Sequence, residues 1–71
     1  MSEILKERLK ESVGKDIKIF LENGFRYYGK ITNCDDYYVE ILDYKSNSYI
    51  VLEIKNIDNI EVSVGEKNDT N

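Results

Sequence analysis

One stretch of the chain, Ile17 to Ile31 (IKIFLENGFRYYGKI), limits the fold more than any other. Apolar and polar residues alternate on both sides of Asn23-Gly24. An Asn-Gly pair in that setting is the strongest short-range signal for a β-hairpin with a type I′ turn. Gly29 lies inside the second strand, where a glycine is typical of a sharp bend or a close backbone approach. We therefore predict a hairpin over residues 17–32 that curls as in a small barrel.

Strand patterning continues to residue 64. The third, fourth and fifth strands are expected at about Tyr37 to Tyr44, at Tyr49 to Ile54 and at about Ile57 to Val64. Between the third and fourth strands, the polar run Lys45 to Ser48 is too short to hold a crossover helix, so these strands are predicted to be antiparallel.

A short amphipathic helix is predicted before the strands, at residues 2–12. Ser2 is suited to cap it, Gly14 is suited to end it, and one apolar stripe follows helical spacing through Leu5, Leu9 and Val13. Such a stripe usually packs on a core, here over the open end of the barrel. The fold class is therefore mainly β: an N-terminal α-helix followed by a five-stranded, strongly bent antiparallel small barrel.

Length and composition favour one small domain that gains stability by assembly. The 71 residues contain a single cysteine, Cys34, and no histidine, so no internal disulfide is possible and a zinc site has too few ligands. A core of this size alone provides about 3–5 kcal/mol. We predict a domain over residues 1–64, a disordered tail over residues 65–71 (GEKNDTN), and no cofactor or metal. No apolar run approaches the ~18 residues of a membrane span, so we expect a cytoplasmic protein that binds no membrane.

The net charge of −4 argues against non-specific binding of long duplexes, where many phosphates must be neutralised together. The acidic groups are partly segregated, however, onto one helix face and into the tail: Glu3, Glu7 and Glu11, then Glu66 and Asp69. A neutral or mildly basic patch is therefore possible elsewhere on the surface.

Enzymatic chemistry finds no support in the sequence. Asp35 and Asp36 are adjacent, but neighbouring side chains point apart, and no histidine or activated nucleophile accompanies them. Cys34 lacks a base partner and is expected to be a small buried residue. The four glycines are scattered, so no phosphate-binding loop is present. We predict that the protein is not an enzyme.

The fourth strand, Tyr49 to Ile54, fits two arrangements. Its residues are apolar apart from Glu53. At an open sheet edge, a single charge would protect the strand poorly from pairing with another chain. If it is an edge, it is able to pair with the fifth strand of a second copy, and such head-to-tail pairing closes a ring when the rotation per subunit divides a full turn. The alternative is an internal strand that is simply buried.

Taken in order, these motifs resemble the Sm-like family of Sm, LSm and Hfq proteins over roughly residues 4–64. The first motif combines the alternating strand with Asn23-Gly24, Tyr27, Gly29 and Asp35. At the second motif, Sm proteins usually show Ile-Arg-Gly and bacterial Hfq proteins show Tyr-Lys-His. The chain has Ile54-Lys55-Asn56 and is thus more similar to Hfq.

The resemblance implies a homo-oligomeric ring of six or seven subunits that binds short single-stranded, often U-rich, RNA around its pore. The short turn at Lys45 to Ser48 and the pair Lys55-Asn56 favour six. A ring gives each weak site a high effective concentration, and Lys55 repeated around a pore would concentrate positive potential. The implied activity is that of an RNA chaperone, which promotes RNA annealing or remodelling.

Carried over by position, the resemblance implies an RNA-binding pocket in which Tyr37 stacks on a base and Lys55 supplies the cation, with Asn56 beside it. Asp35 would brace the pocket by hydrogen bonds, and Asp36 would supply an acceptor. Sm proteins generally carry an asparagine at the position of Val39, where its amide contacts a uracil edge. Valine cannot make that bond.

Hfq proteins also bind A-rich RNA on the opposite face of the ring. By alignment, four residues would approach that second face: Phe20, Leu21, Phe25 and Tyr28. Two other readings compete with RNA binding. One is a small-barrel module that contacts proteins through the same edges and tyrosines, and the other is a monomeric SH3-like domain of a larger complex.

Overall fold

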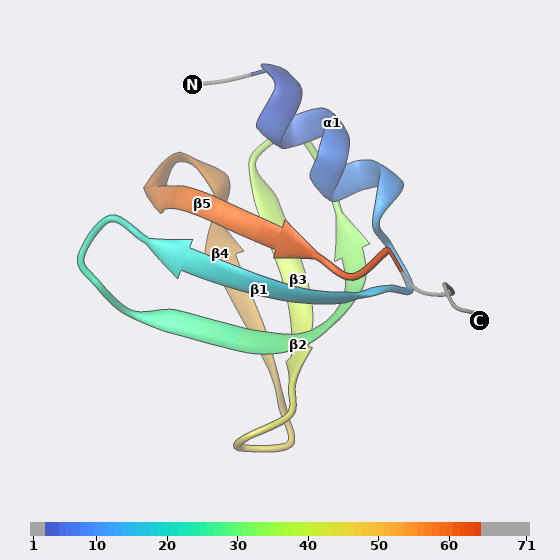
Figure 1. The fold of residues 1–71 in the computed structure, drawn as a ribbon, viewed down its shortest axis with the longest axis vertical. Coiled ribbons are helices and arrows are strands. Elements are labelled where there is room, and N and C mark those ends of the chain that lie inside the picture. Colours follow the sequence, from blue (N-terminus) through green and yellow to red (C-terminus); the bar gives the residue numbers. More distant parts are fainter. Residues whose placement is uncertain (1–2, 65–71) are drawn as a thin grey trace.

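The computed structural model describes residues 3–64, which form a helix and a five-stranded antiparallel sheet (Figure 1). The elements in chain order are α1 (Glu3–Glu11), β1 (Asp16–Leu21), β2 (Arg26–Cys34), β3 (Tyr38–Asp43), β4 (Ser48–Glu53), the 3₁₀ helix η1 (Ile54–Asn56) and β5 (Ile57–Val62). The expected cap Ser2 and the expected tail lie outside the described residues. Within residues 3–64, no helix has the length and apolar character needed to cross a membrane.

The sheet is strongly bent but not closed. Its strand order is β4-β3-β2-β1-β5, and each neighbouring pair is antiparallel. In Figure 1, β1 and β5 run across β3 and β4, because β2 curves from one half of the sheet into the other. The predicted helix and five antiparallel strands are confirmed. The barrel stays open, and of the two arrangements considered for β4 the structure has the edge strand.

Gly29 marks the bend in β2. It pairs with Ile17 of β1 on one side and with Asp43 of β3 on the other. A Cβ atom on Gly29 would lie 2.1 Å from the carbonyl oxygen of Leu42, which is far inside van der Waals contact. The register of β2 against β3 also shifts between Ile31 and Asn33, and such an irregularity increases the local bend. The predicted close backbone approach at Gly29 is confirmed.

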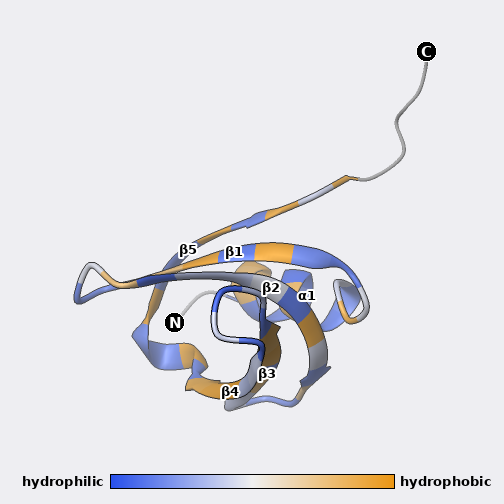
Figure 2. Cartoon of the chain, turned by 90° about the horizontal axis from the view of Figure 1, so that it is seen from below, coloured by the Kyte–Doolittle hydropathy of each residue, from blue (hydrophilic) through white to orange (hydrophobic). Residues whose placement is uncertain are grey.

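The hydrophobic core lies inside the bent sheet and beneath α1. Hydrophobic and hydrophilic residues alternate along the strands (Figure 2), which places one face of each strand inward. The buried apolar residues are Leu9, Ile17, Ile19, Ile31, Val39, Ile41, Ile54 and Ile57. Ile50 and Leu52 of β4 are partly buried and pack against this core. This small, isoleucine-rich core therefore joins the helix to the whole sheet.

The predicted helical stripe holds for Leu5 and Leu9, which pack on the core, and is wrong for Val13. The helix ends at Glu11, and the chain turns through Gly14 at a φ of +91°. Val13 is consequently exposed, while the buried Ser12 donates a hydrogen bond from Oγ to the carbonyl oxygen of Arg8 at 2.6 Å.

The hairpin turn between β1 and β2 is not the predicted type I′ turn. That type requires a positive φ at two central residues, but Gly24 has a φ of +93° and Asn23 does not have a positive φ. The Leu21 amide donates to the Phe25 carbonyl at 2.8 Å, and this bond encloses the three residues 22–24. Within the turn, the Gly24 amide donates to the Leu21 carbonyl at 3.0 Å. Asn23 Oδ1 accepts from the Phe25 amide at 3.0 Å, so its side chain stabilises the turn.

Replacing Gly29 with alanine tests the bend. The added methyl group would overlap Leu42 backbone atoms, so we expect Gly29→Ala to lower the free energy of unfolding by about 3 kcal/mol, measured by urea denaturation. Gly24→Ala is the matched comparison, because a Cβ atom there meets nothing within 4 Å and adds only the cost of a left-handed backbone, about 1–2 kcal/mol. A Gly24→Ala variant less stable than Gly29→Ala would contradict this account.

Candidate functional site

An open groove of about 580 Å³ lies where the β2–β3 turn meets η1. It brings together three of the residues predicted from the sequence, Asp36, Tyr37 and Lys55. The other lining residues are Lys6, Tyr38, Glu53 and Ile54. Tyr37 is 74% exposed, so its ring is free to contact a ligand in the groove.

A backbone contact builds the groove from two distant segments. The Ile54 amide donates a hydrogen bond to the Tyr37 carbonyl at 2.9 Å, and Tyr38 pairs with Glu53 in the β3–β4 ladder. Ile54 is buried in the core, which fixes η1 against the start of β3. This contact holds Tyr37 and Lys55 on the same groove.

Asp35 organises the β2–β3 turn. Its Oδ1 atom accepts hydrogen bonds from the Tyr37 and Tyr38 amides, each at 2.8 Å, and its own amide donates to the Tyr38 carbonyl at 2.9 Å. The two amide donors lower the pKa of the Asp35 carboxyl because they stabilise its charged form. These bonds are of the bracing kind expected for Asp35, which does not itself line the groove.

Asp36 forms an ion pair with Lys10 of α1. The contact lowers the pKa of the Asp36 carboxyl and raises the pKa of the Lys10 ammonium. Asp36 is thus partnered to the helix, while Asp35 is partnered to the turn backbone. The two adjacent carboxylates serve separate contacts, as the sequence predicts for neighbouring residues whose side chains point apart.

Lys55 and Asn56 both lie near Glu53. Lys55 Nζ is 4.0 Å from Glu53 Oε2, and Asn56 Nδ2 donates to Glu53 Oε1 at 3.2 Å. The Asn56 carbonyl also accepts from the Glu22 amide at 2.9 Å, which ties η1 to the β1–β2 loop. Asn56 and Lys55 are both exposed, but only Lys55 lines the groove.

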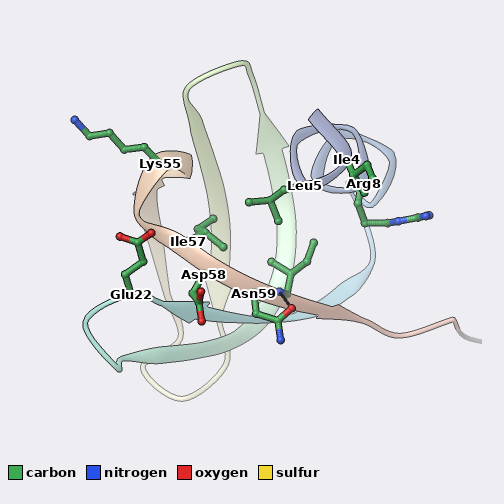
Figure 3. A pocket seen from close by; sticks show the side chains of 9 residues that line it. Ile4, Leu5, Arg8, Glu22, Lys55, Ile57, Asp58 and Asn59 are labelled. Carbon is green, nitrogen blue, oxygen red and sulfur yellow. Dashed lines mark hydrogen bonds between the residues drawn. The ribbon is translucent and has the colours of Figure 1, made fainter. Parts of the chain in front are cut away.

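A second hollow of about 580 Å³ lies on the other side of Lys55, between α1 and β5 (Figure 3). Its lining includes Ile4 and Arg8 from the helix and Ile57 and Asn59 from the strand. In Figure 3 the Lys55 side chain reaches outward from η1, away from the helix. Lys55 therefore borders both hollows.

Sequence reasoning missed the contribution of α1 to the groove. The helix was expected only to cover the barrel end, yet Lys6 lines the groove and Lys10 contacts Asp36. The available signal was the spacing of these two lysines, since residues four apart share one face of a helix. Their partner, Asp36 of the β2–β3 turn, is distant in the chain, so the spacing of the lysines could not indicate it.

The four residues expected on a second RNA-binding face differ in their exposure. Leu21 packs against the core, whereas Phe25 and Tyr28 are 64% and 49% exposed. Phe20 and Leu21 are consecutive in β1, so their side chains lie on opposite faces of the sheet. The Tyr28 ring makes an edge-to-face contact with Tyr44, with ring centroids 5.3 Å apart. Leu21 is thus partly buried, and the second RNA-binding face stays a prediction.

Cys34 is only partly buried, not fully buried as expected. Its Sγ atom donates to the Asp35 carbonyl at 3.4 Å, and burial raises the pKa of the thiol. Across residues 3–64, no group of three His, Cys, Asp or Glu residues is placed to hold a metal ion.

Comparison with protein-family models gives no match, and comparison with curated protein sequences gives none either. The resemblance to Sm-like proteins thus depends on the motifs of the chain itself.

Acid unfolding tests the role of Asp35. Its folded-state pKa lies below the ordinary value of 3.8, so its carboxylate stabilises the fold above pH 3.8, and this contribution is lost as the pH falls through the lowered pKa. We expect Asp35→Asn, which keeps an acceptor oxygen but not the charge, to show a smaller fall in melting temperature than the wild type between about pH 6 and about pH 2. An equal fall in both proteins would show that the charge of Asp35 does not stabilise the turn.

Proposed function

We propose that the chain is an Sm-like, Hfq-like protein that forms a ring and binds short single-stranded RNA, acting as an RNA chaperone in the cytoplasm. The observation that carries this proposal is the groove that the exposed Tyr37 and Lys55 line together. An aromatic ring next to a cation suits an unpaired nucleotide, because the ring stacks on the base and the cation attracts the phosphate. The proposed role of both groups is binding.

The open sheet supports the ring. β4 and β5 are the two edges, each six residues long, and each leaves one side of its backbone without a strand partner within residues 3–64. Tyr49 and Val51 on β4 are 68% and 59% exposed, which is unfavourable for an edge in water. Pairing β4 of one copy with β5 of the next would cover these residues and leave no free edge. We propose six copies, with seven as the alternative.

Repetition around a ring compensates for the modest size of each groove. One stacked base contributes about 1–3 kcal/mol, and several grooves that hold one strand act together through effective concentration. Val39, at the position of the uracil-binding asparagine of Sm proteins, is fully buried in the core. Stacking on Tyr37 is tolerant of base identity, so the proposal covers A-rich strands as well as the U-rich strands typical of the family.

The exposed apolar residues of β4 also favour a second candidate function, a protein interaction module. In that case Tyr49 and Val51 would contact a different protein, and the groove would bind no RNA. A cytoplasmic location accords with either function, because the lone Cys34 would stay a thiol there.

Removing the Tyr37 ring tests RNA binding directly. We expect Tyr37→Ala to weaken binding of hexauridylate by about 1–3 kcal/mol for each stacked base, measured by fluorescence anisotropy. Tyr37→Phe keeps the ring and is expected to bind as the wild type does. Equal affinity of all three proteins would exclude stacking on Tyr37, and no binding by the wild type would favour the protein interaction module.

Ring assembly is tested by placing a charge on the β4 edge. Native mass spectrometry of the wild type is expected to show six copies of the 8.3 kDa chain. Val51→Lys should shift the mass toward a single chain, because a lysine on an edge strand opposes pairing. Val13→Lys is the matched control, since Val13 is exposed but lies in the turn after α1. A wild-type protein found only as single chains would contradict the ring.

A further inference from the structure

Each carboxylate of the groove is ion-paired with a lysine, and one further lysine of the lining has no such pair within residues 3–64. The two acids of the lining are Asp36 and Glu53. Asp36 is ion-paired with Lys10, and Glu53 Oε2 lies 4.0 Å from Lys55 Nζ. Lys6 also lines the groove, and it makes no hydrogen bond or ion pair with any residue of the 3–64 range.

The position of Lys6 is fixed by the packing of its helix. Leu5 and Leu9 of α1 pack in the core, so the helix is anchored on both turns that carry Lys6 and Lys10. Residues four apart lie on the same side of a helix. The two lysines therefore face the β2–β3 turn together, where Lys10 meets Asp36 and Lys6 lies close enough to lower the pKa of the same carboxyl.

We propose that Lys6 is a phosphate-binding residue of the groove, which holds the RNA backbone while the base lies on Tyr37, and that Lys10 is a positioning residue that neutralises Asp36. This inference rests on the proposed RNA binding and assigns the phosphate contact to α1. From the sequence alone, the helix is expected only to cover the core.

The charges explain why both lysines are needed. A phosphate that enters the groove meets the carboxylates of Asp36 and Glu53, and both repel it. With Lys10 included, three lysines face these two carboxylates, which leaves a net positive charge in the groove. Without Lys10 the groove is neutral, and Lys6 is then the cation nearest to an uncompensated Asp36. In a protein of net charge −4, this local arrangement allows an anionic strand to bind.

The salt dependence of binding tests the role of Lys6. Hexauridylate affinity is measured from about 50 to 200 mM salt, where each phosphate neutralised on a single strand contributes about 0.7 to the slope of log K against log salt. Lys6→Gln is expected to weaken binding and to reduce the slope by about 0.7 for each occupied groove. Lys45→Gln removes the same charge from the exposed β3–β4 turn, at the far end of β3, and is expected to change neither quantity.

A charge-compensated pair tests Lys10. Lys10→Gln is expected to weaken binding because it leaves Asp36 uncompensated, and the double variant Lys10→Gln with Asp36→Asn is expected to recover the wild-type affinity and salt slope. A double variant as weak as Lys10→Gln alone would overturn the positioning role, because only the charge of Asp36 separates the two proteins.

The outcomes separate this inference from the proposed function. If Lys6→Gln keeps the wild-type affinity and slope while Tyr37→Ala weakens binding, RNA binds in the groove but Lys6 does not hold its phosphate. If the wild type does not bind hexauridylate at any salt concentration, the RNA-binding function itself fails. Melting temperatures near that of the wild type show that the variants are folded.

Discussion

The contact between the bare backbone of Gly29 and the Leu42 carbonyl is the constraint on which the rest of the structure depends. A side chain at Gly29 would push β3 away from β2, since its Cβ atom would lie 2.1 Å from the Leu42 oxygen. Because that approach is possible, β2 bends and carries β3 and β4 across β1 and β5. The bend encloses a small core and leaves β4 and β5 as separate free edges. The fold, the proposed ring and the groove all follow from this geometry.

The candidate site depends on a few hydrogen bonds at one end of the bent sheet. The Ile54 amide and the Tyr37 carbonyl join η1 to the start of β3, and Asp35 holds the intervening turn through two amides. Because Ile54 is buried, this end of the sheet is connected to the core. An exposed tyrosine is thereby held on a rigid support, which would lower the entropy lost if a base stacks on it as proposed.

Local pairing of charges would allow an acidic chain to bind the anionic ligand proposed for it. The protein carries a net charge of −4, which by itself disfavours nucleic acid. At the groove, however, Asp36 and Glu53 each have a lysine within ion-pair distance. Lys6 also lines the groove, and within residues 3–64 no carboxylate lies within ion-pair distance of it. A ligand responds to this local potential more than to the sum over the chain.

Sequence alone determined the elements of this protein, and tertiary structure decided how they combine. Alternation, Gly29 and the polar turns predicted the helix, the five antiparallel strands and the close approach, because these features arise from local backbone preferences and side-chain periodicity. The β1–β2 turn and the exposure of Val13 differed from expectation. Both depend on the single residue at which the chain turns. The motifs singled out Asp36, Tyr37 and Lys55, and the structure brings these residues to one groove. The place of β4 at the edge and the approach of Lys6 and Lys10 to Asp36 were decided by contacts between distant segments. The periodicity of a sequence shows which face of an element is apolar, but it does not show which distant segment packs against that face.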